Sequence, residues 1–431
     1  MGGDFLKKMA AAIAIFMTAL LLITACNSNN STPETSEELT TKEITTAETT
    51  EQVTTAPITT IQTAVTSSSV ATGVSTVTAN PQQPRTSAPI NNCTSRYGYY
   101  QLSADEKIIY DQIVDAAKTF QTEVILKQKL PSENVKKVCN LVYLEENNLY
   151  YINEYSQYYN GTTGLVSKVG LSYRYTSMTV DIINKEVEAK AKQILAKITP
   201  QMSVVDKIKL FHDEIILNCS YNTTSEYKTT PYGALVSGEA LCEGYSRAFA
   251  LLCNKVGIEN LFATSAPVGN EQHMWNMVKL NGYWYNIDLT NDDPISSDER
   301  IGPDYICYNY FLFKNTEFGR PNVLDNSLFT LPQATASQFN YFNYYGLYAA
   351  SYSQFETLLG TEILKALQSK DKYVNIKLAS KDLYQEAADN LTNEKLSTLF
   401  DYFDSQTGHE GSYYYSLSPE LNIIQVQITY E

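Results

Sequence analysis

The chain has 431 residues, 43% of them hydrophobic, and its formal net charge at neutral pH is -15. This length allows about two or three domains with buried cores. The acidity, together with the absence of a basic stripe, argues against nucleic acid as a partner, because phosphates would be repelled. A neutral or basic peptide is a more compatible substrate.

Residues 1–25 have the features of a secretory signal peptide. Lys7 and Lys8 make a positive start, and the apolar run over residues 9–23 is shorter than a membrane-spanning helix requires. The run ends in the letters ITAC, which resemble a bacterial lipoprotein cleavage box with Cys26 as the lipidated residue. This resemblance implies a lipid anchor on the outer side of the cell membrane. An ordinary signal peptide or an anchor helix is the alternative.

Residues 26–92 are dominated by Thr, Ser, Ala, Val, Gln, Glu and Pro. Such a composition cannot bury a core, so this segment is predicted to be a disordered, extended tether. We interpret it as a spacer that gives the rest of the chain reach, without binding specificity of its own.

Residues 93–199 are predicted to form a small α+β segment. Helical periodicity begins after Ser103, a suitable cap, and continues to a stop at Pro131. The Tyr-rich stretches that follow favour strands, since aromatic side chains suit half-buried sheets. The expected elements are helices over 103–130, 136–144 and 182–198 and strands over 149–155 and 170–175.

A further helix is predicted over residues 204–218, and it carries the first of the three histidines. His212 lies beside Phe211 and within one turn of Ile208 and Ile215. A buried structural histidine is therefore favoured over a catalytic base at this position. His409 lies in a Gly-rich loop and is expected to be exposed.

The helix after residue 241 is predicted to begin at Cys242 and to stop at Gly257. Unpaired N–H groups and the positive end of the helix dipole favour a thiolate at such a position. Gly238 and Gly244 flank the sulfur without bulk, so a substrate backbone could approach it. The helix face is defined by apolar side chains at offsets of 0, 3, 4, 7 and 11, namely Tyr245, Ala248, Phe249, Leu252 and Val256.

The stretch after the helix reads as a β-hairpin closed at Asn281-Gly282, the strongest two-residue turn signal. In that register His273 and Asp288 are diagonal neighbours on one face, roughly 7–8 Å apart at the backbone. An aspartate so placed holds an imidazole in one tautomer and stabilises its charged form. One face is expected to be apolar (Met274, Val278, Leu280, Tyr285, Ile287, Leu289) and the other to carry His273, Trp275, Lys279, Trp284, Asn286 and Asp288.

Nucleophile, base and orienting carboxylate together are typical of thiol acyl-transfer enzymes. The alternative is a buried cysteine at a helix start without chemistry, which would leave the His273 and Asp288 diagonal unexplained. Asp292 and Asp293 are interpreted as part of a solvated turn ahead of Pro294.

The segments GALVSGEALCEGYSRAFALL, HMWN and YWYNIDLTNDD, in this order, resemble the transglutaminase-like superfamily of papain-related thiol enzymes. The resemblance covers roughly residues 200–315. It implies an α+β fold in which a helix bearing the cysteine packs on an antiparallel sheet bearing the histidine and the aspartate. It also implies that Cys242, His273 and Asp288 are the catalytic residues of a domain over residues 200–330.

Details of the implied substrate groove are less defined. Leu289 and Asn291 stand where related sequences often have Pro and Trp, which affects the expected shape of the groove wall. Gly244, Trp275 and Trp284 are candidate groove residues, with packing against the helix as the alternative for the two tryptophans. The Cys242 backbone N–H is the expected first oxyanion donor.

Residues 331–431 are predicted to form a separate α/β module. Its expected elements are helices over 353–369 and 381–403 and strands over 373–378 and 421–429. The chain has 33 tyrosines, and strand packing explains their clusters more simply than sugar stacking does.

Neither a metal nor another cofactor is expected. Three histidines and no Cys-x-x-Cys pair argue against a zinc site. Apart from Cys26 and Cys242, the cysteines are odd in number and irregularly spaced, so they define no disulfide framework: Cys93, Cys139, Cys219, Cys253 and Cys307.

The sequence therefore predicts a surface-tethered thiol enzyme acting on peptide or side-chain amides, with hydrolysis as a protease or amidase favoured. One alternative is a transglutaminase that cross-links surface proteins by amine transfer. The other is a noncatalytic cell-surface binding module that keeps the fold.

Overall fold

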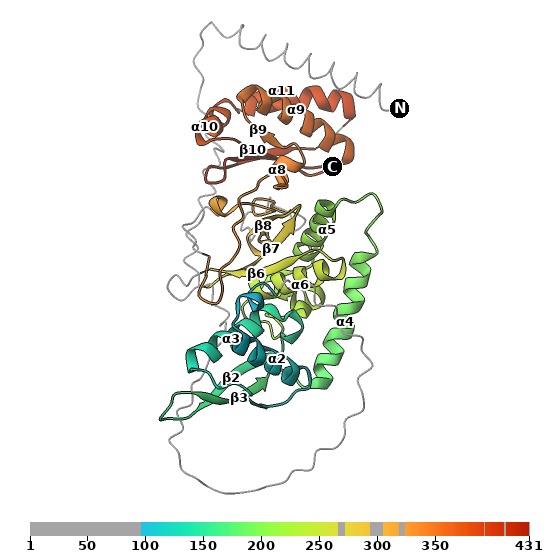
Figure 1. Ribbon diagram of the computed structural model, residues 1–431. Helices are drawn as coiled ribbons and strands as arrows, with labels where there is room; N and C mark the ends of the chain where they lie inside the picture. The colour runs from blue at the N-terminus through green and yellow to red at the C-terminus, as the bar shows by residue number, and fades with distance from the viewer. Residues whose placement is uncertain are drawn as a thin grey trace. The chain divides into compact units, whose positions relative to one another are not determined.

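The computed structural model describes residues 96–265, 272–293, 305–318, 324–391, 393–408 and 411–430 (Figure 1). The expected signal peptide, Cys26, the tether, Cys93 and His409 lie outside these ranges. The described chain divides into two compact units, one ending at Phe339 and one beginning at Asn340. Within these ranges no helix has the length and apolar character needed to cross a bilayer, and no cluster of three or more ligating side chains could hold a metal ion.

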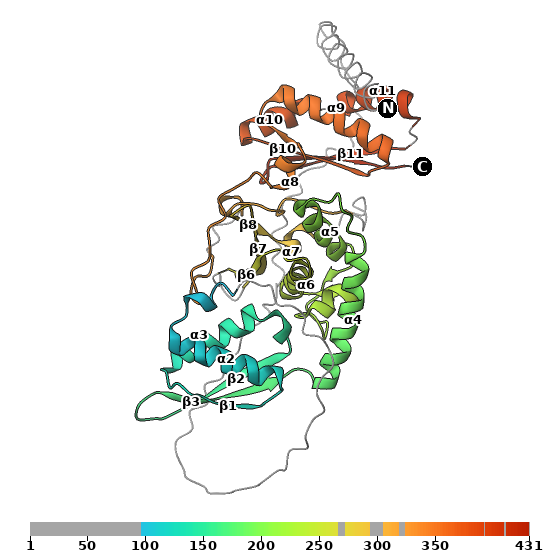
Figure 2. The ribbon, with the colours of Figure 1, turned by 45° about the vertical axis from the view of Figure 1, so that its right-hand side comes forward.

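The first unit begins with a small α+β segment, in which α2 (Ala104–Lys118) and α3 (Ser132–Glu145) pack together over a three-stranded sheet. Both ribbon views show these helices on one side of the sheet (Figures 1 and 2). Its antiparallel strands have the order β1-β3-β2 and are β1 (Glu123–Ile125), β2 (Ile152–Tyr159) and β3 (Val166–Tyr173). Short 3-10 turns at Tyr99–Gln101 and Asn147–Leu149 complete the segment.

The start of α2 agrees with the sequence, because Ser103 and Glu106 form a reciprocal capping box. The prediction of one helix over 103–130 is wrong. The helix ends at Lys118, Phe120 adopts a positive φ of 56°, and β1 pairs with β3 instead. Pairing with a strand 47 residues further on, as between Glu123 and Gly170, overrides the local helical pattern.

Two longer helices connect this segment to the rest of the unit. α4 (Ser177–Leu195) starts after the cap Thr176, and α5 (Val204–Ile216) starts with a capping box of Ser203 and Asp206. Figures 1 and 2 both show α4 running along the side of the unit. α5 packs against the central helix α6 (Cys242–Lys255).

The core of the unit is α6 packed on an antiparallel sheet of β6 (Asn260–Thr264), β7 (Met274–Leu280) and β8 (Tyr283–Ile287), in the order β6-β7-β8. The predicted hairpin register is confirmed by the pairs Leu280 with Tyr283 and Asn276 with Ile287. Asn281 and Gly282 have φ values of 50° and 85°, as the tight turn requires. Ahead of α6, a π-helical turn (Gly233–Ser237) and a parallel pair of β4 (Ser220–Tyr221) and β5 (Glu239–Ala240) lead to Cys242.

The second face of the hairpin is buried, although its sequence carries polar side chains. Ser246 and Asn276 join α6 to β7 on one face, while Phe313 and Phe318 lie on the side of Trp275. A β-bridge between Asn286 and Phe313 extends the sheet at this edge. Both faces of the hairpin are thus covered by other parts of the unit.

The second unit is an α/β module with a four-stranded sheet of order β11-β12-β10-β9. β9 is parallel to β10 and the other pairs are antiparallel. Helices α9, α10 and α11 cover one side of this sheet, and the short α8 lies on the other (Figures 1 and 2). The bounds are α8 (Tyr341–Tyr344), β9 (Tyr348–Ala349), α9 (Tyr352–Ser369), β10 (Tyr373–Leu378), α10 (Lys381–Asn390), α11 (Asn393–Thr407), β11 (Tyr413–Ser418) and β12 (Ile423–Ile428).

Two predictions for this module need correction. The expected single helix over 381–403 is two helices, because Leu391 leaves the helical region with ψ of 82° and turns inward to the core. β11 was not predicted, and it forms by pairing with β12.

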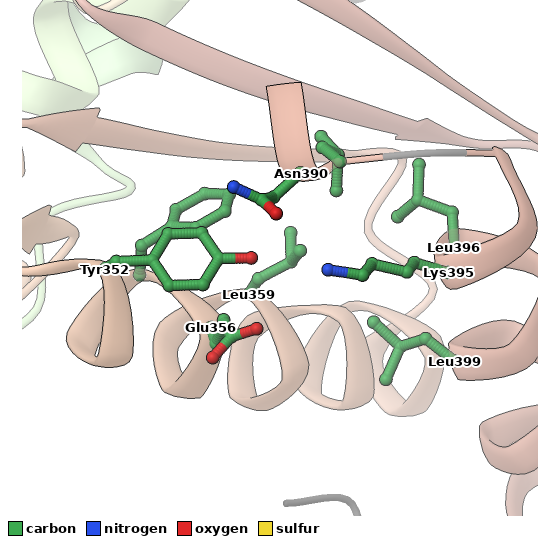
Figure 3. Close-up of a pocket in the computed structure, with 9 residues that line it drawn as sticks. Tyr352, Glu356, Leu359, Asn390, Lys395, Leu396 and Leu399 are labelled. Carbon is green, nitrogen blue, oxygen red and sulfur yellow. The ribbon is translucent and has the colours of Figure 1, made fainter. Parts of the chain in front are cut away.

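Between α9, the end of α10 and α11 lies a cavity of about 30 Å³, room for a water molecule or two. Figure 3 shows its apolar wall from Leu359, Leu396 and Leu399 and its polar rim from Tyr352, Glu356, Asn390 and Lys395.

A buried polar network joins the α+β segment to α6. Arg247 Nε donates to Glu243 Oε1 at 2.9 Å, and Arg247 Nη2 donates to the Tyr143 carbonyl at 2.9 Å. The Tyr143 hydroxyl donates to the same Glu243 oxygen at 2.6 Å. All three side chains are buried, so each depends on the others for its hydrogen bonds.

Replacing Tyr143 by Phe is expected to lower the free energy of unfolding by about 1–3 kcal/mol, because a buried carboxylate loses a donor. Urea unfolding of the full chain measures this. Tyr155→Phe is the matched control, since the Tyr155 hydroxyl is buried in the same segment without a hydrogen-bond partner among the described residues. Its removal should change the free energy by less than about 0.5 kcal/mol. Equal losses in both variants would contradict a special contribution of the network.

Candidate active site

Cys242 lies at the start of α6, as the sequence predicts, and its residue is 4% exposed. The N-cap residue is Leu241, which makes no side-chain capping bond to the helix. The first-turn N–H groups therefore lack a competing side-chain acceptor at the N-cap. Their dipoles favour negative charge on the sulfur.

Gly244 is small because the chain packs against it. A Cβ on Gly244 would lie 2.5 Å from the Lys228 carbonyl oxygen and 2.7 Å from the Cβ of Ala240. The same Lys228 carbonyl accepts from the Leu241 N–H at 2.9 Å. The space that the sequence assigns to an approaching substrate is thus filled by the segment before α6, which fixes the position of the helix start.

His273 directly precedes β7 and is held through its backbone. Its N–H donates to Ser265 Oγ at 3.0 Å, and its carbonyl accepts from the Ser265 N–H at 2.9 Å. Its Nε2 lies 2.6 Å from Asp288 Oδ2, and Cys242 is close enough to the ring to raise its pKa. Since Nε2 is engaged by the carboxylate, Nδ1 is the nitrogen left for the thiol. Both of the other predicted site residues therefore act on this ring.

The charged form of His273 is stabilised by its partners. Burial lowers the pKa of the imidazole, but the charge and hydrogen bond of Asp288, followed by those of Cys242, outweigh burial and raise the pKa to about 10. The side chain retains 28% exposure, so water can reach the ring. An imidazolium at neutral pH is the partner that a thiolate requires.

Asp288 is fully buried and forms the N-cap of a short helix, α7 (Leu289–Asp292). Its Oδ1 accepts from the Asn291 N–H at 3.2 Å, and its Oδ2 accepts from Asn291 Nδ2 at 2.6 Å. Its own N–H donates to the Tyr310 carbonyl at 3.0 Å. The strand does not continue past Ile287, so the diagonal expected from a strand pair is completed by a helix cap.

The two tryptophans proposed for the groove make packing contacts. Trp275 is 1% exposed, stacks against His273 at 5.9 Å between centroids and meets Phe318 edge to face at 4.9 Å. Its Nε1 donates to Asn286 Oδ1 at 2.9 Å. Trp284 is also buried and meets Tyr97 edge to face at 5.8 Å. Their partners lie outside α6, so Trp275 acts on the site by supporting the imidazole.

The interpretation of Asp292 and Asp293 as a solvated turn is wrong. Asp292 is fully buried and lies 3.1 Å from the equally buried His212. Asp293 accepts from the Tyr245 hydroxyl, and burial raises the pKa of its carboxyl to about 6. The available sequence signal was the spacing of four between Asp288 and Asp292, which stacks two carboxylates along one helical turn.

The five cysteines in the part of the chain that the structure describes are free thiols, and four of them are buried. Burial raises the pKa of Cys219 and Cys307 to about 12. These two thiols therefore stay protonated near neutral pH, and neither has the imidazole partner that Cys242 has.

A thiol at a helix start, together with an imidazole that is bonded to a buried carboxylate, is the side-chain set of a thiol acyl-transfer site. Residues 188–289 match the family model of the Transglutaminase-like superfamily, and this match includes Cys242, His273 and Asp288. The chain thus contains a transglutaminase-like domain, and the family expected from the motifs is confirmed.

Two solved structures are similar to parts of the chain. One, described as a "Putative Cysteine Protease" from Cytophaga hutchinsonii, is 14% identical with a TM-score of 0.22, over 32% of this chain and 61% of that one. The other, described as a "TGase", is 16% identical with a TM-score of 0.24, over 42% of this chain and 53% of that one. The chain thus covers less than two thirds of either structure. A search of curated proteins found no match.

Replacing Asp288 by Asn is expected to move the titration of His273 to lower pH by several units. Asp288 is first among the groups that raise this pKa to about 10, whereas burial lowers it. With three histidines in the chain, the ring signals can be followed by NMR as the pH rises from 5 to 11. Asp115→Asn on the exposed face of α2 is the control and should leave the titration unchanged. An unchanged midpoint in the Asp288 variant would show that the carboxylate does not set the charge of the ring.

Proposed function

We propose that this chain is a thiol acyl-transfer enzyme that acts on peptide or side-chain amides, with hydrolysis as its main reaction. The observation that supports this most directly is the placement of His273, whose Nε2 lies 2.6 Å from Asp288 Oδ2 and whose pKa is raised by both Asp288 and Cys242. The transglutaminase-like match over residues 188–289 agrees with the proposal, because it contains all three side chains.

In the proposed reaction the Cys242 proton resides on His273, and the sulfur attacks the carbonyl carbon of the amide. The carbonyl π electrons move to oxygen, where the Cys242 backbone N–H is one donor at the uncapped helix start. When the tetrahedral species collapses, the C–N bond breaks and His273 protonates the leaving amine. Asp288 keeps the ring oriented through both proton transfers.

The remaining thioester is resolved by water. His273 takes a proton from the water as it attacks, and the carboxylic acid leaves as the Cys242 sulfur departs. The partial exposure of His273 gives water a route to the base, which favours hydrolysis over transfer to a second amine.

The proposed setting is the outer surface of the cell membrane. Lipidation at Cys26 would anchor the chain, and the tether over residues 26–92 would carry the domain away from the anchor. The net charge of -15 favours neutral or basic protein and peptide substrates in this setting.

The nucleophile is tested by alkylation of the full chain with iodoacetamide, followed by mass spectrometry of each cysteine peptide. Cys242 should react at least about tenfold faster near pH 7 than the thiol of an unstructured reference peptide, because it is paired with an imidazolium. Cys307 is the internal control and should react slowly, since burial raises its pKa to about 12. Reaction of Cys242 no faster than the reference would refute the proposal and favour a noncatalytic binding module.

The reaction type is tested with a glutamine-containing peptide library and a labelled primary amine. Cleaved peptide or released ammonia without amine incorporation is expected, and Cys242→Ala should abolish it, a loss of about 10⁴-fold or more. Cys307→Ala should retain the rate. Incorporation of the amine as the main product would identify a transglutaminase and refute hydrolysis as the main reaction.

A further inference from the structure

His212 lies between two carboxylates in the interior of the first unit. Its Nε2 is 3.1 Å from Asp292 Oδ2 and its Nδ1 is 3.0 Å from Asp213 Oδ1. Two acceptors facing two ring nitrogens require two N–H donors, and only the imidazolium has both. Burial opposes this charge, but the two carboxylates raise the pKa of His212 above its ordinary value. The ring is therefore a buried group whose partners favour its charged form, and it has no role in the proposed proton transfers.

Asp292 connects the His212 ring to the turn that carries Asp288. The Asp292 N–H donates to the Asp288 carbonyl at 3.2 Å, which closes the single turn of α7. Asp292 Oδ1 accepts from the Tyr310 N–H at 2.9 Å, while the Tyr310 carbonyl accepts from the Asp288 N–H at 3.0 Å. The backbone of residue 310 and the side chain of His212 thus hold both ends of the turn.

His212 also acts on the turn through its charge. Burial raises the pKa of Asp292 to about 6, and the nearby charge of Asp288 acts in the same direction. His212 and its hydrogen bond oppose this rise and favour the ionised carboxylate. A positive charge on His212 offsets the repulsion between the carboxylates of Asp288 and Asp292, which lie one helical turn apart.

The other nitrogen of His212 faces a different environment. Asp213 is partly exposed and is paired with Lys209, whose Nζ lies 2.6 Å from Asp213 Oδ2 and 2.8 Å from the Tyr308 hydroxyl. The Tyr308 ring stacks on His212 at 5.3 Å between centroids, and Phe311 meets it edge to face. This side anchors the ring to α5, and no hydrogen bond described for Asp213 leads to Asp288.

We propose that His212 is a positioning residue for the candidate active site: through Asp292 it fixes the turn that presents Asp288 to His273. This inference rests on the proposed thiol chemistry. It assigns a role to a histidine of α5 that does not itself contact Cys242, His273 or the substrate in the proposed reaction. The bond between His212 and Asp292 links α5 to α7. The carboxylate of Asp288 then links α7 to the imidazole of His273.

The test compares two amides at one position. The amide nitrogen of Gln reaches the place of the histidine Nε2, whereas that of Asn reaches the place of Nδ1. Both variants remove the charge, but only His212→Gln keeps a donor toward Asp292. His212→Asn should lower the alkylation rate of Cys242 and the rate of amide hydrolysis about tenfold or more, with kcat rather than KM affected. His212→Gln should keep both rates within about threefold of those of the unaltered chain.

A second pair avoids any change in the histidine and keeps side-chain size constant. Asp292→Asn should lower the same rates and move the alkaline end of the rate profile to lower pH by about one unit, because the loosened turn weakens the hold of Asp288 on His273. Asp213→Asn, which changes the partner of His212 Nδ1, should leave the alkaline end of the rate profile unchanged. Thermal unfolding of all four variants identifies any that fail to fold.

The outcomes separate this inference from the proposed function. If Cys242 in the unaltered chain shows no enhanced alkylation, the thiol chemistry is refuted and the inference with it. If Cys242 is reactive but folded Asp292→Asn and His212→Asn chains keep its rate and pH profile, His212 is only a packing residue and the inference alone is overturned. An equal shift in the Asp213→Asn chain would also overturn it, because the effect would then not pass through Asp292.

Discussion

The hydrogen bond between the His273 ring and the buried carboxylate of Asp288 is the interaction on which the candidate site depends. A fully buried carboxylate is costly unless its oxygens are satisfied, and here His273 and two groups of Asn291 supply the donors. The same bond makes the imidazole a cation and sets its orientation. The sulfur of Cys242 then meets a ring with one nitrogen already engaged, so the remaining nitrogen is directed by the carboxylate.

Much of the surrounding structure serves to hold the carriers of these groups in place. α6 is fixed at its start by the close approach of the Lys228 carbonyl to Gly244, and it is fixed on its other side by Glu243 and Arg247 against Tyr143. The hairpin that leads to His273 and Asp288 is covered on both faces. The α+β segment belongs to the same unit because Tyr143 bonds to Glu243 and Arg247 of α6.

Several features could be predicted from local chemistry. The Asn281-Gly282 turn determines the register of β7 and β8, since only certain residues adopt positive φ at both turn positions. Periodicity placed the start of α6 at Cys242. Other predictions were wrong where distant pairing decides: β1 was included in a helix, and β11 was not predicted because it forms only beside β12. A pattern within one segment carries no information about its partner strand.

The sequence by itself determined which residues are available for chemistry and in what order, because the turn residues, the helix start and the family motifs are all local signals. Tertiary structure alone decided which polar groups are buried. Asp292 reads as solvated in the chain and becomes fully buried only when α5 brings His212 against α7. Likewise, Trp275 is covered because Phe318 folds back onto the sheet. Burial is a property of contacts between distant segments, and it sets the charge of an ionisable group more strongly than its neighbours in sequence do.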